Sequence, residues 1–277
     1  MRAKKGVLKF LRYVLIYLLL VLFIMPFYLM VINSFKTTQQ FVASPFSLPE
    51  PEKVGFDNYI SAFNKMNFMN AIGNSLVITI ISILLILLTS SMAAYFLVRH
   101  QWKINKVIFA VLVASMIVPF QAIMIPLVSI YGSLNLMNSK WILIFMYMGF
   151  GQAFAIFIFH GFIKNIPAEM EESALIDGCS KIQLFFRIVF PLLKPVIVTV
   201  LILDVLWIWN DYLLPSLILL SPAERTLPLS TYNFFNTYSV DYAPLMAGIV
   251  LTIIPVVAVY LFSQKHIIEG VVQGAIK

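Results

Sequence analysis

Charged residues, cysteine and histidine are all scarce in this sequence. Only 11% of its 277 residues are charged, against about a quarter in soluble domains, and 61% are hydrophobic. The single cysteine, Cys179, has no partner for an intramolecular disulfide, and the three histidines are too scattered to indicate a metal site. A water-soluble fold, a disulfide framework and a histidine metal centre are therefore not expected.

Motifs for nucleotide binding and hydrolysis are also missing. The sequence contains no Gly-x-x-x-x-Gly-Lys-Ser/Thr loop, whose backbone amides and lysine would cradle nucleotide phosphates. It also lacks a His-Glu-x-x-His zinc motif and a Gly-x-Ser-x-Gly nucleophile elbow. We therefore expect a protein that is not an enzyme and that holds no cofactor of its own.

Six apolar segments are long enough to cross a membrane. A bilayer core about 30 Å thick needs roughly 20 apolar residues in a helix, because only a helix satisfies its own backbone polar groups in lipid. The segments run over about 13–32, 75–98, 107–131, 141–163, 196–220 and 243–263. The sequence thus predicts one all-α transmembrane domain over residues 1–277.

The basic residues indicate how this domain is oriented. If the N-terminus is cytoplasmic, fourteen of the nineteen Lys and Arg residues lie in inner segments and five in outer segments. This is the bias that the positive-inside rule describes, so both termini are expected in the cytoplasm of a bacterial-type cell. The net charge of +7 is explained by these flanks, and no nucleic-acid partner is expected.

The inner segment 164–195 is too long and too patterned for a simple turn. Pro167 suits the first turn of a helix, and the following acids complement the positive end of its dipole: Glu169, Glu171 and Glu172. Gly178 can end this helix in a left-handed conformation. Apolar residues then recur at helical spacing from Ile182 to Val189, which predicts a helix, turn, helix element.

A spaced motif in this segment resembles a known family. Glu172-Ser173-Ala174 is followed after three residues by Gly178, and after nine more by Ile188, one residue, and Phe190-Pro191. This pattern is similar to the EAA signature of binding-protein-dependent ABC importer permeases. Ser173 replaces the usual second alanine and Phe190 the usual leucine, and both changes keep the size or apolar character of the position.

The resemblance implies the type I ABC importer permease fold, with six transmembrane helices and a cytoplasmic coupling-helix hairpin. In that family the short helix sits in a groove of a separate ATPase subunit, which binds ATP and Mg. By resemblance Glu172 would pair with a basic residue of the ATPase, Gly178 would allow the turn, and Ala174 and Leu175 would fill the groove. The expected coupling residues are Glu169, Glu172, Ser173, Ala174, Leu175, Asp177 and Gly178.

The similarity extends over almost the whole chain. Asn33-Ser34-Phe35-Lys36, Asn58-Tyr59, Trp209-Asn210-Asp211 and the ending 269–277 resemble the smaller permease of maltose-type sugar importers. The implied partners are a second, homologous permease, two ATPase subunits, an extracytoplasmic sugar-binding protein and membrane lipid. In that branch the C-terminal tail reaches the ATPase dimer, a role that would fall here on Gln273 and Gly274.

Two acids in the fifth segment suggest a path for the substrate. Asp204, Trp207 and Asp211 are spaced i, i+3 and i+7, so a continuous helix would place them on one face, with Asn210 beside them. Carboxylates accept hydrogen bonds from sugar hydroxyls, and an aromatic face packs on a sugar ring. Alternatively, the aspartates bond to neighbouring helices or lie near the wet outer boundary. The resemblance to the maltose type favours this alternative, because there most sugar contacts come from the larger permease.

Three other functions remain open. The same acids would suit an ABC importer of a cationic solute such as a polyamine, because no span contains Lys or Arg. They could also carry the ion of an ion-coupled secondary transporter. A membrane-bound assembly protein without transport activity is the third alternative.

Overall fold

The computed structural model describes residues 2–236 and 239–275, with side chains for residues 9–52, 54–236 and 239–262. Within these ranges the chain is almost entirely helical, and its β-type pairing is one isolated bridge between Phe235 and Val240. This confirms the all-α fold class.

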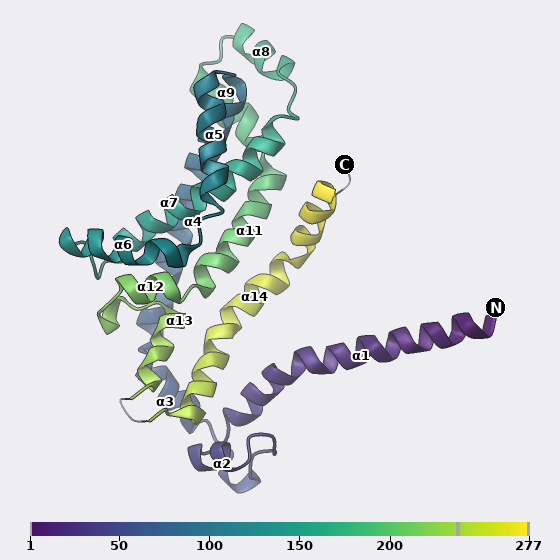
Figure 1. Ribbon diagram of the computed structural model, residues 1–277, viewed down its shortest axis with the longest axis vertical. Coiled ribbons are helices and arrows are strands. Elements are labelled where there is room, and N and C mark those ends of the chain that lie inside the picture. Colours follow the sequence, from purple (N-terminus) through teal and green to yellow (C-terminus); the bar gives the residue numbers. More distant parts are fainter. Residues whose placement is uncertain (1, 237–238, 276–277) are drawn as a thin grey trace. The chain divides into compact units, whose positions relative to one another are not determined.

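The helices follow the chain in this order (Figure 1). They are α1 (Arg2–Asn33), α2 (Thr38–Ala43), α3 (Asp57–Lys65), α4 (Phe68–Arg99), α5 (Lys103–Ser115), α6 (Phe120–Ser133), α7 (Lys140–Ile163), α8 (Glu169–Ile176), α9 (Lys181–Leu184), α10 (Phe190–Leu192), α11 (Lys194–Asn210), α12 (Leu213–Ile218), α13 (Leu227–Ser230) and α14 (Tyr242–Ala275). A π-helical turn, Phe185–Val189, joins α9 to α10, and single 3₁₀ turns cover Pro51–Lys53, Pro222–Glu224 and Thr231–Phe234.

Four helices in the described residues are long and apolar enough to cross a bilayer alone. They are Lys9–Asn33 of α1, α4, α7 and Tyr242–Phe262 of α14. Two bent pairs bring the number of candidate spans to six if each pair is one span: α5 with α6, at 100°, and Lys181–Leu192 with α11, at 74°. All six candidates overlap the six apolar segments of the sequence.

The third apolar segment, 107–131, contains two helices because the helix is interrupted before Pro119. Proline disfavours helical geometry at the preceding residue, and it has no backbone N–H to donate to the turn before it. Pro119 itself is extended, with φ −68° and ψ 139°, and it forms the N-cap of α6. Hydropathy alone detects the apolar length of this segment and misses the bend.

The fifth apolar segment, 196–220, is also divided. Helix α11 ends at Asn210 because Asp211 is extended, with φ −69° and ψ 129°, and α12 begins two residues later. On the N-terminal side, Pro191 lies in α10 and Pro195 in the first turn of α11, on either side of the 74° bend.

The chain forms two compact units, residues 1–69 with 230–255 and residues 70–229 with 256–277. In the first unit, hydrogen bonds join two segments that are distant from each other in sequence. The Asn58 amide donates to the carbonyl oxygens of Ser34 and Lys36, each at 2.8 Å, and the Ser34 and Tyr59 hydroxyls lie 2.8 Å apart. The Asn33–Lys36 and Asn58–Tyr59 motifs are therefore parts of one cluster.

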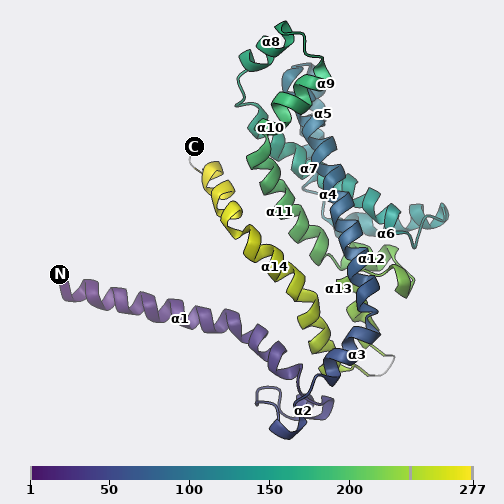
Figure 2. The same ribbon diagram turned by 180° about the vertical axis from the view of Figure 1, so that it is seen from behind.

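The second unit is built around α4, α7 and α11 (Figures 1 and 2). Its largest fully buried side chains include Ile78, Ile86, Leu143, Tyr147, Phe159, Ile163, Leu193 and Ile218. Gly151 of α7 allows a close approach of α4, since a Cβ atom there would lie 2.5 Å from Ile86 Cδ1. Gly149, by contrast, faces open space.

We predict that Gly151→Leu lowers the free energy of unfolding by about 1–3 kcal/mol, because the added side chain overpacks the contact with Ile86. Thermal melting of the detergent-purified protein would measure it. Adding Ile86→Ala should restore part of the loss, and Gly149→Leu, whose Cβ meets no atom within 4 Å, should leave the melting temperature nearly unchanged. Equal losses for the two glycine variants would contradict this packing role.

Candidate functional site

Helix α8 lies at one end of the second unit, beside α9 (Figures 1 and 2). Its inner face carries Glu171 and Ala174, which are three residues apart and only 7% exposed each. The Glu171 carboxylate accepts bonds from Arg99 Nε (2.8 Å) and Nη2 (2.5 Å) and from the Tyr95 hydroxyl (2.7 Å). This largely buried ion pair therefore holds α8 against the end of α4.

The same arginine also holds the segment that leads into α8. Arg99 Nη2 donates to the backbone carbonyl of Ile166 at 2.9 Å, and the Ile166 side chain is itself buried. One guanidinium thus holds both the entry to α8 and its inner face, an arrangement suited to its rigid fork of donors.

The end of α8 has the hydrogen bonds of a Schellman motif. The Cys179 N–H donates to the Ala174 carbonyl and the Gly178 N–H to the Leu175 carbonyl, each at 3.1 Å. Gly178 has φ +86°, which confirms the predicted left-handed conformation. Ser180 then caps α9 through a capping box with Gln183. Strong local signals therefore set both sides of this turn.

The outer face of α8 is free of contacts with the rest of the described chain over most of its length. Ile176 is 86% exposed and Leu175 45%, and the other exposed positions are Glu169, Met170, Glu172, Ser173 and Asp177. Of the two apolar residues predicted to fill a groove, Leu175 points outward and Ala174 inward. The exposed surface of α8 is a short apolar ridge flanked by acids.

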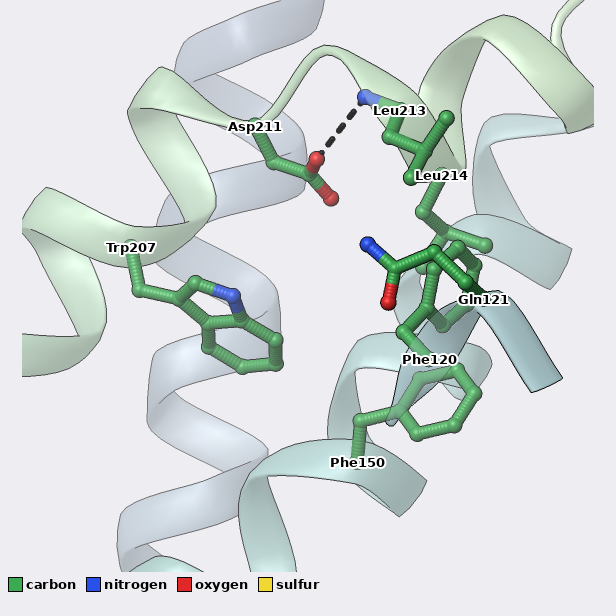
Figure 3. Close-up of a pocket in the computed structure, with 7 residues that line it drawn as sticks. All are labelled: Phe120, Gln121, Phe150, Trp207, Asp211, Leu213 and Leu214. Carbon is green, nitrogen blue, oxygen red and sulfur yellow. Dashed lines mark hydrogen bonds between the residues drawn. The ribbon is translucent and has the colours of Figure 1, made fainter. Parts of the chain in front are cut away.

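A second candidate site lies beside α11. Two hollows, of about 260 and 290 Å³, share Phe150 and Trp207 in their walls. The first is also lined by Phe120, Gln121, Asp211, Leu213 and Leu214, and the second by Gly151, Phe154, Leu203 and Asp204. Figure 3 shows the Gln121 amide and the Asp211 carboxylate directed into one space, which the Trp207 indole borders.

The two aspartates have different surroundings. Asp211 Oδ2 accepts a bond from the Tyr147 hydroxyl at 2.8 Å, and Oδ1 accepts one from the Leu213 N–H at 2.9 Å. Asp204 is only 2% exposed, and its Oδ2 has no hydrogen-bond partner among the described residues. Asn210 is exposed, bonds back to Leu206 of its own helix and lines neither hollow.

Residues 86–273 match the family model of the binding-protein-dependent transport system inner membrane component. The chain belongs to this family. The permease is therefore a multi-pass membrane protein of a transport system, as the fold and the EAA-like segment indicate.

Full-length relatives carry related names. The probable starch degradation products transport system permease protein AmyC of Thermoanaerobacterium thermosulfurigenes is 40% identical over 96% of the permease and 97% of its own length. The multiple sugar-binding transport system permease protein MsmG of Streptococcus mutans is 36% identical over the full length of both chains. The melibiose/raffinose/stachyose import permease protein MelC of Bacillus subtilis is 33% identical over 91% of each.

A solved structure shows the same fold. One chain of a bacterial ABC transporter involved in the import of the acidic polysaccharide alginate superimposes with a TM-score of 0.82. The match covers 95% of the permease and 97% of that chain at 21% sequence identity. This supports the predicted type I ABC importer permease fold.

Sequence reasoning does not find some residues of the two candidate sites. Glu171 was interpreted only as a dipole-compensating acid, and its partners Tyr95 and Arg99 lie more than 70 residues away. The one available signal was the i, i+3 spacing of Glu171 and Ala174, which separates them from the outward residues of α8. Gln121 is not found either, because it reaches the hollow through the bend between α5 and α6, which hydropathy does not predict.

The predicted C-terminal contact with the ATPase, Gln273 and Gly274, lies in the last turns of α14. The side chains of these two residues fall outside the described part of the chain. Among the described residues of the permease, no group of three His, Cys, Asp or Glu side chains could hold a metal ion.

Proposed function

We propose that the permease is a pore-forming subunit of an ATP-driven importer of sugars, oligosaccharides in particular. The family membership carries the transport assignment, and the sugar assignment rests on relatives that match nearly the whole chain and are named for starch degradation products, multiple sugars and raffinose-type oligosaccharides. A separate ATPase would bind the ATP and Mg.

In this proposal, α8 is the coupling helix. Its exposed ridge of Leu175 and Ile176 has the size and chemistry to enter a groove of the ATPase, and Glu172 beside it can pair with a basic residue there. Glu169, Ser173 and Asp177 would complete the contact, and the buried ion pair of Glu171 would carry the movement of α8 to α4. Gln273 and Gly274 would add a second contact to the ATPase.

The charge bias of the sequence supports cytoplasmic termini in a bacterial-type plasma membrane, with 164–195 as the inner coupling segment. The partners would be a second, homologous permease, two ATPase subunits and an extracytoplasmic sugar-binding protein. ATP-driven closure of the ATPase dimer would draw the coupling helices together and shift the permeases from inward-open to outward-open. In this proposal the permeases themselves adopt both the inward-open and the outward-open state, and the nucleotide shifts the equilibrium between these states.

A second candidate substrate is a cationic solute such as a polyamine. The buried Asp204 carboxylate, next to aromatic walls, favours it, because carboxylates and aromatic faces both attract cations. Uptake of spermidine rather than sugars would identify this alternative.

The proposed function is tested by uptake into proteoliposomes that contain the full assembly. We expect uptake of labelled maltotriose or raffinose that requires ATP and the ATPase subunits and is insensitive to ionophores. Uptake that persisted without the ATPase and stopped when the ion gradient collapsed would identify a secondary transporter instead.

Cross-linking tests the contact at α8 in the same assembly. In a Cys179→Ser background, Ile176→Cys should form a cross-link to the ATPase, because Ile176 is the most exposed residue of the ridge. The matched control is Leu48→Cys, which is 69% exposed but lies in a predicted outer segment and should form none. Absence of any link from Ile176, or an equal link from Leu48, would contradict the proposed coupling face.

A further inference from the structure

Asp204 presents a buried acceptor that the described protein does not satisfy. It lies in α11, ten residues or about 15 Å after the first residue of the helix and six residues or about 9 Å before its last. Its side chain is 2% exposed, and Oδ2 lacks a hydrogen-bond partner in the described residues. Buried carboxylate oxygens are normally bonded, because desolvation without a partner is costly. A hydrogen-bond donor is therefore missing at this position.

The hollow beside Asp204 shows where that donor can enter. It measures about 290 Å³, at the lower end of the range for small-molecule sites, which fits one sugar ring better than a whole oligosaccharide. Its remaining walls are apolar or aromatic: Phe150, Gly151, Phe154, Leu203 and Trp207. The Trp207 indole is 42% exposed, and Tyr147 packs against it edge-on, at 5.6 Å between ring centroids. A supported indole face thus stands next to an unsatisfied carboxylate.

Asp211 has a different role, although it lies close to Trp207. Both of its oxygens are occupied, one by the Tyr147 hydroxyl and the other by the Leu213 backbone N–H. The second bond stabilises the turn between α11 and α12. Asp211 therefore holds the helix break in place and has less capacity left for a ligand than Asp204.

We propose that Asp204 and Trp207 form a subsite for one neutral sugar ring in transit through the permease. The Asp204 carboxylate accepts hydrogen bonds from ring hydroxyls, and the indole covers the apolar face of the ring. Gln121, in the adjoining hollow, offers both a donor and an acceptor, which suits hydroxyl groups better than a bare cation. This inference rests on the proposed sugar importer and adds that this chain contacts the sugar directly.

The test compares variants of Asp204 in the complete reconstituted assembly. Maltotriose or raffinose, whichever the wild type imports, serves as the probe, and the sugar imported per ATP hydrolysed is measured. Asp204→Leu, which removes the acceptor, should lower this ratio about tenfold, the effect of one hydrogen bond to a charged group, while ATP hydrolysis continues. Trp207→Ala should lower it as well, and Trp207→Phe, which keeps an aromatic face, should lower it less. Thr199→Val, on the same helix but outside both hollows, is the matched control and should change nothing.

A stability measurement separates ligand binding from a structural role. If Asp204 serves a ligand, Asp204→Leu should leave the melting temperature of the purified complex unchanged or raise it, since it removes an unsatisfied buried group. A lower melting temperature would show that Asp204 is bonded to the partner permease, and it would overturn the inference.

Two further results would also overturn the proposal. An unchanged ratio in both Asp204→Leu and Trp207→Ala, with normal wild-type uptake, would refute the subsite and leave the importer function intact. Spermidine uptake that is lost in Asp204→Asn, while sugar uptake is unaffected, would identify a cation site. Absence of ATP-driven sugar uptake in the wild-type assembly would overturn the proposed function and the subsite together.

Discussion

Arg99→Ala is expected to destabilise the permease by about 3 kcal/mol and to reduce uptake strongly. The substitution leaves Glu171 buried next to Ala174 without its cation, and breaking one partner of a buried pair costs about 3–5 kcal/mol. We expect the lower end because the Arg99 side chain is 19% exposed. Thermal melting of the purified assembly measures the first effect.

The effect on transport follows from the position of this ion pair. Arg99 is the last residue of α4, and its bonds to Glu171 and to the Ile166 carbonyl hold α8 against that helix end. If the lost energy falls on the docked state of α8, about 3 kcal/mol reduces the docked population on the order of a hundredfold relative to the undocked one. Sugar uptake per ATP hydrolysed should fall accordingly.

A double variant separates the buried charge from other causes. Arg99→Ala with Glu171→Gln should be more stable than Arg99→Ala alone, because the amide is neutral and can still accept from the Tyr95 hydroxyl. Lys103→Ala removes an exposed cation four residues after Arg99 in the sequence and should have little effect. A double variant no more stable than Arg99→Ala would show that the ion pair does not have the role assigned to it.

Local patterns in the sequence were sufficient for the turn after α8. Gly178 was predicted to be left-handed because a helical acidic stretch precedes it and a second helical pattern follows, and its φ of +86° agrees. The structure adds the two carbonyls that its turn satisfies, at Ala174 and Leu175. Those bonds are local, so the sequence contained enough information to predict them.

Contacts between distant residues were beyond such reasoning. The prediction that Asp204 and Asp211 lie on one helical face assumed a continuous helix, but α11 ends at Asn210. Asp211 accepts a hydrogen bond from Tyr147 of α7, a contact that no periodicity in α11 reveals. In the same way, Glu171 differs from Glu172 because only Glu171 meets Arg99. Hydropathy is therefore sufficient to predict the fold, whereas the hydrogen-bond partners and burial of each acid depend on tertiary packing.

Gly178→Val is expected to uncouple ATP hydrolysis from uptake while leaving the permease inserted in the membrane. A β-branched residue is strongly disfavoured at φ +86°, and such backbone strain costs about 1–3 kcal/mol. The chain can relieve the strain by giving up the bonds from Gly178 and Cys179 that end α8, which would change the angle of the exposed ridge at Leu175 and Ile176. Uptake per ATP hydrolysed and the Ile176→Cys cross-link to the ATPase should both decrease.

The choice of substituent makes this result specific to the backbone. A Cβ atom at Gly178 would meet no atom of the described chain within 4 Å, so crowding of that atom within the permease does not explain a loss. Gly178→Asn carries a side chain of similar size but tolerates the left-handed region, and it should therefore retain most of the uptake. If Asn were as harmful as Val, the cause would be a side chain at position 178 that disturbs the contact with the partner. If Val were harmless, the orientation of α8 would not control coupling. The left-handed turn is the one element of this segment that can be altered without touching the acids or the apolar ridge, so this pair of variants tests geometry separately from contact chemistry.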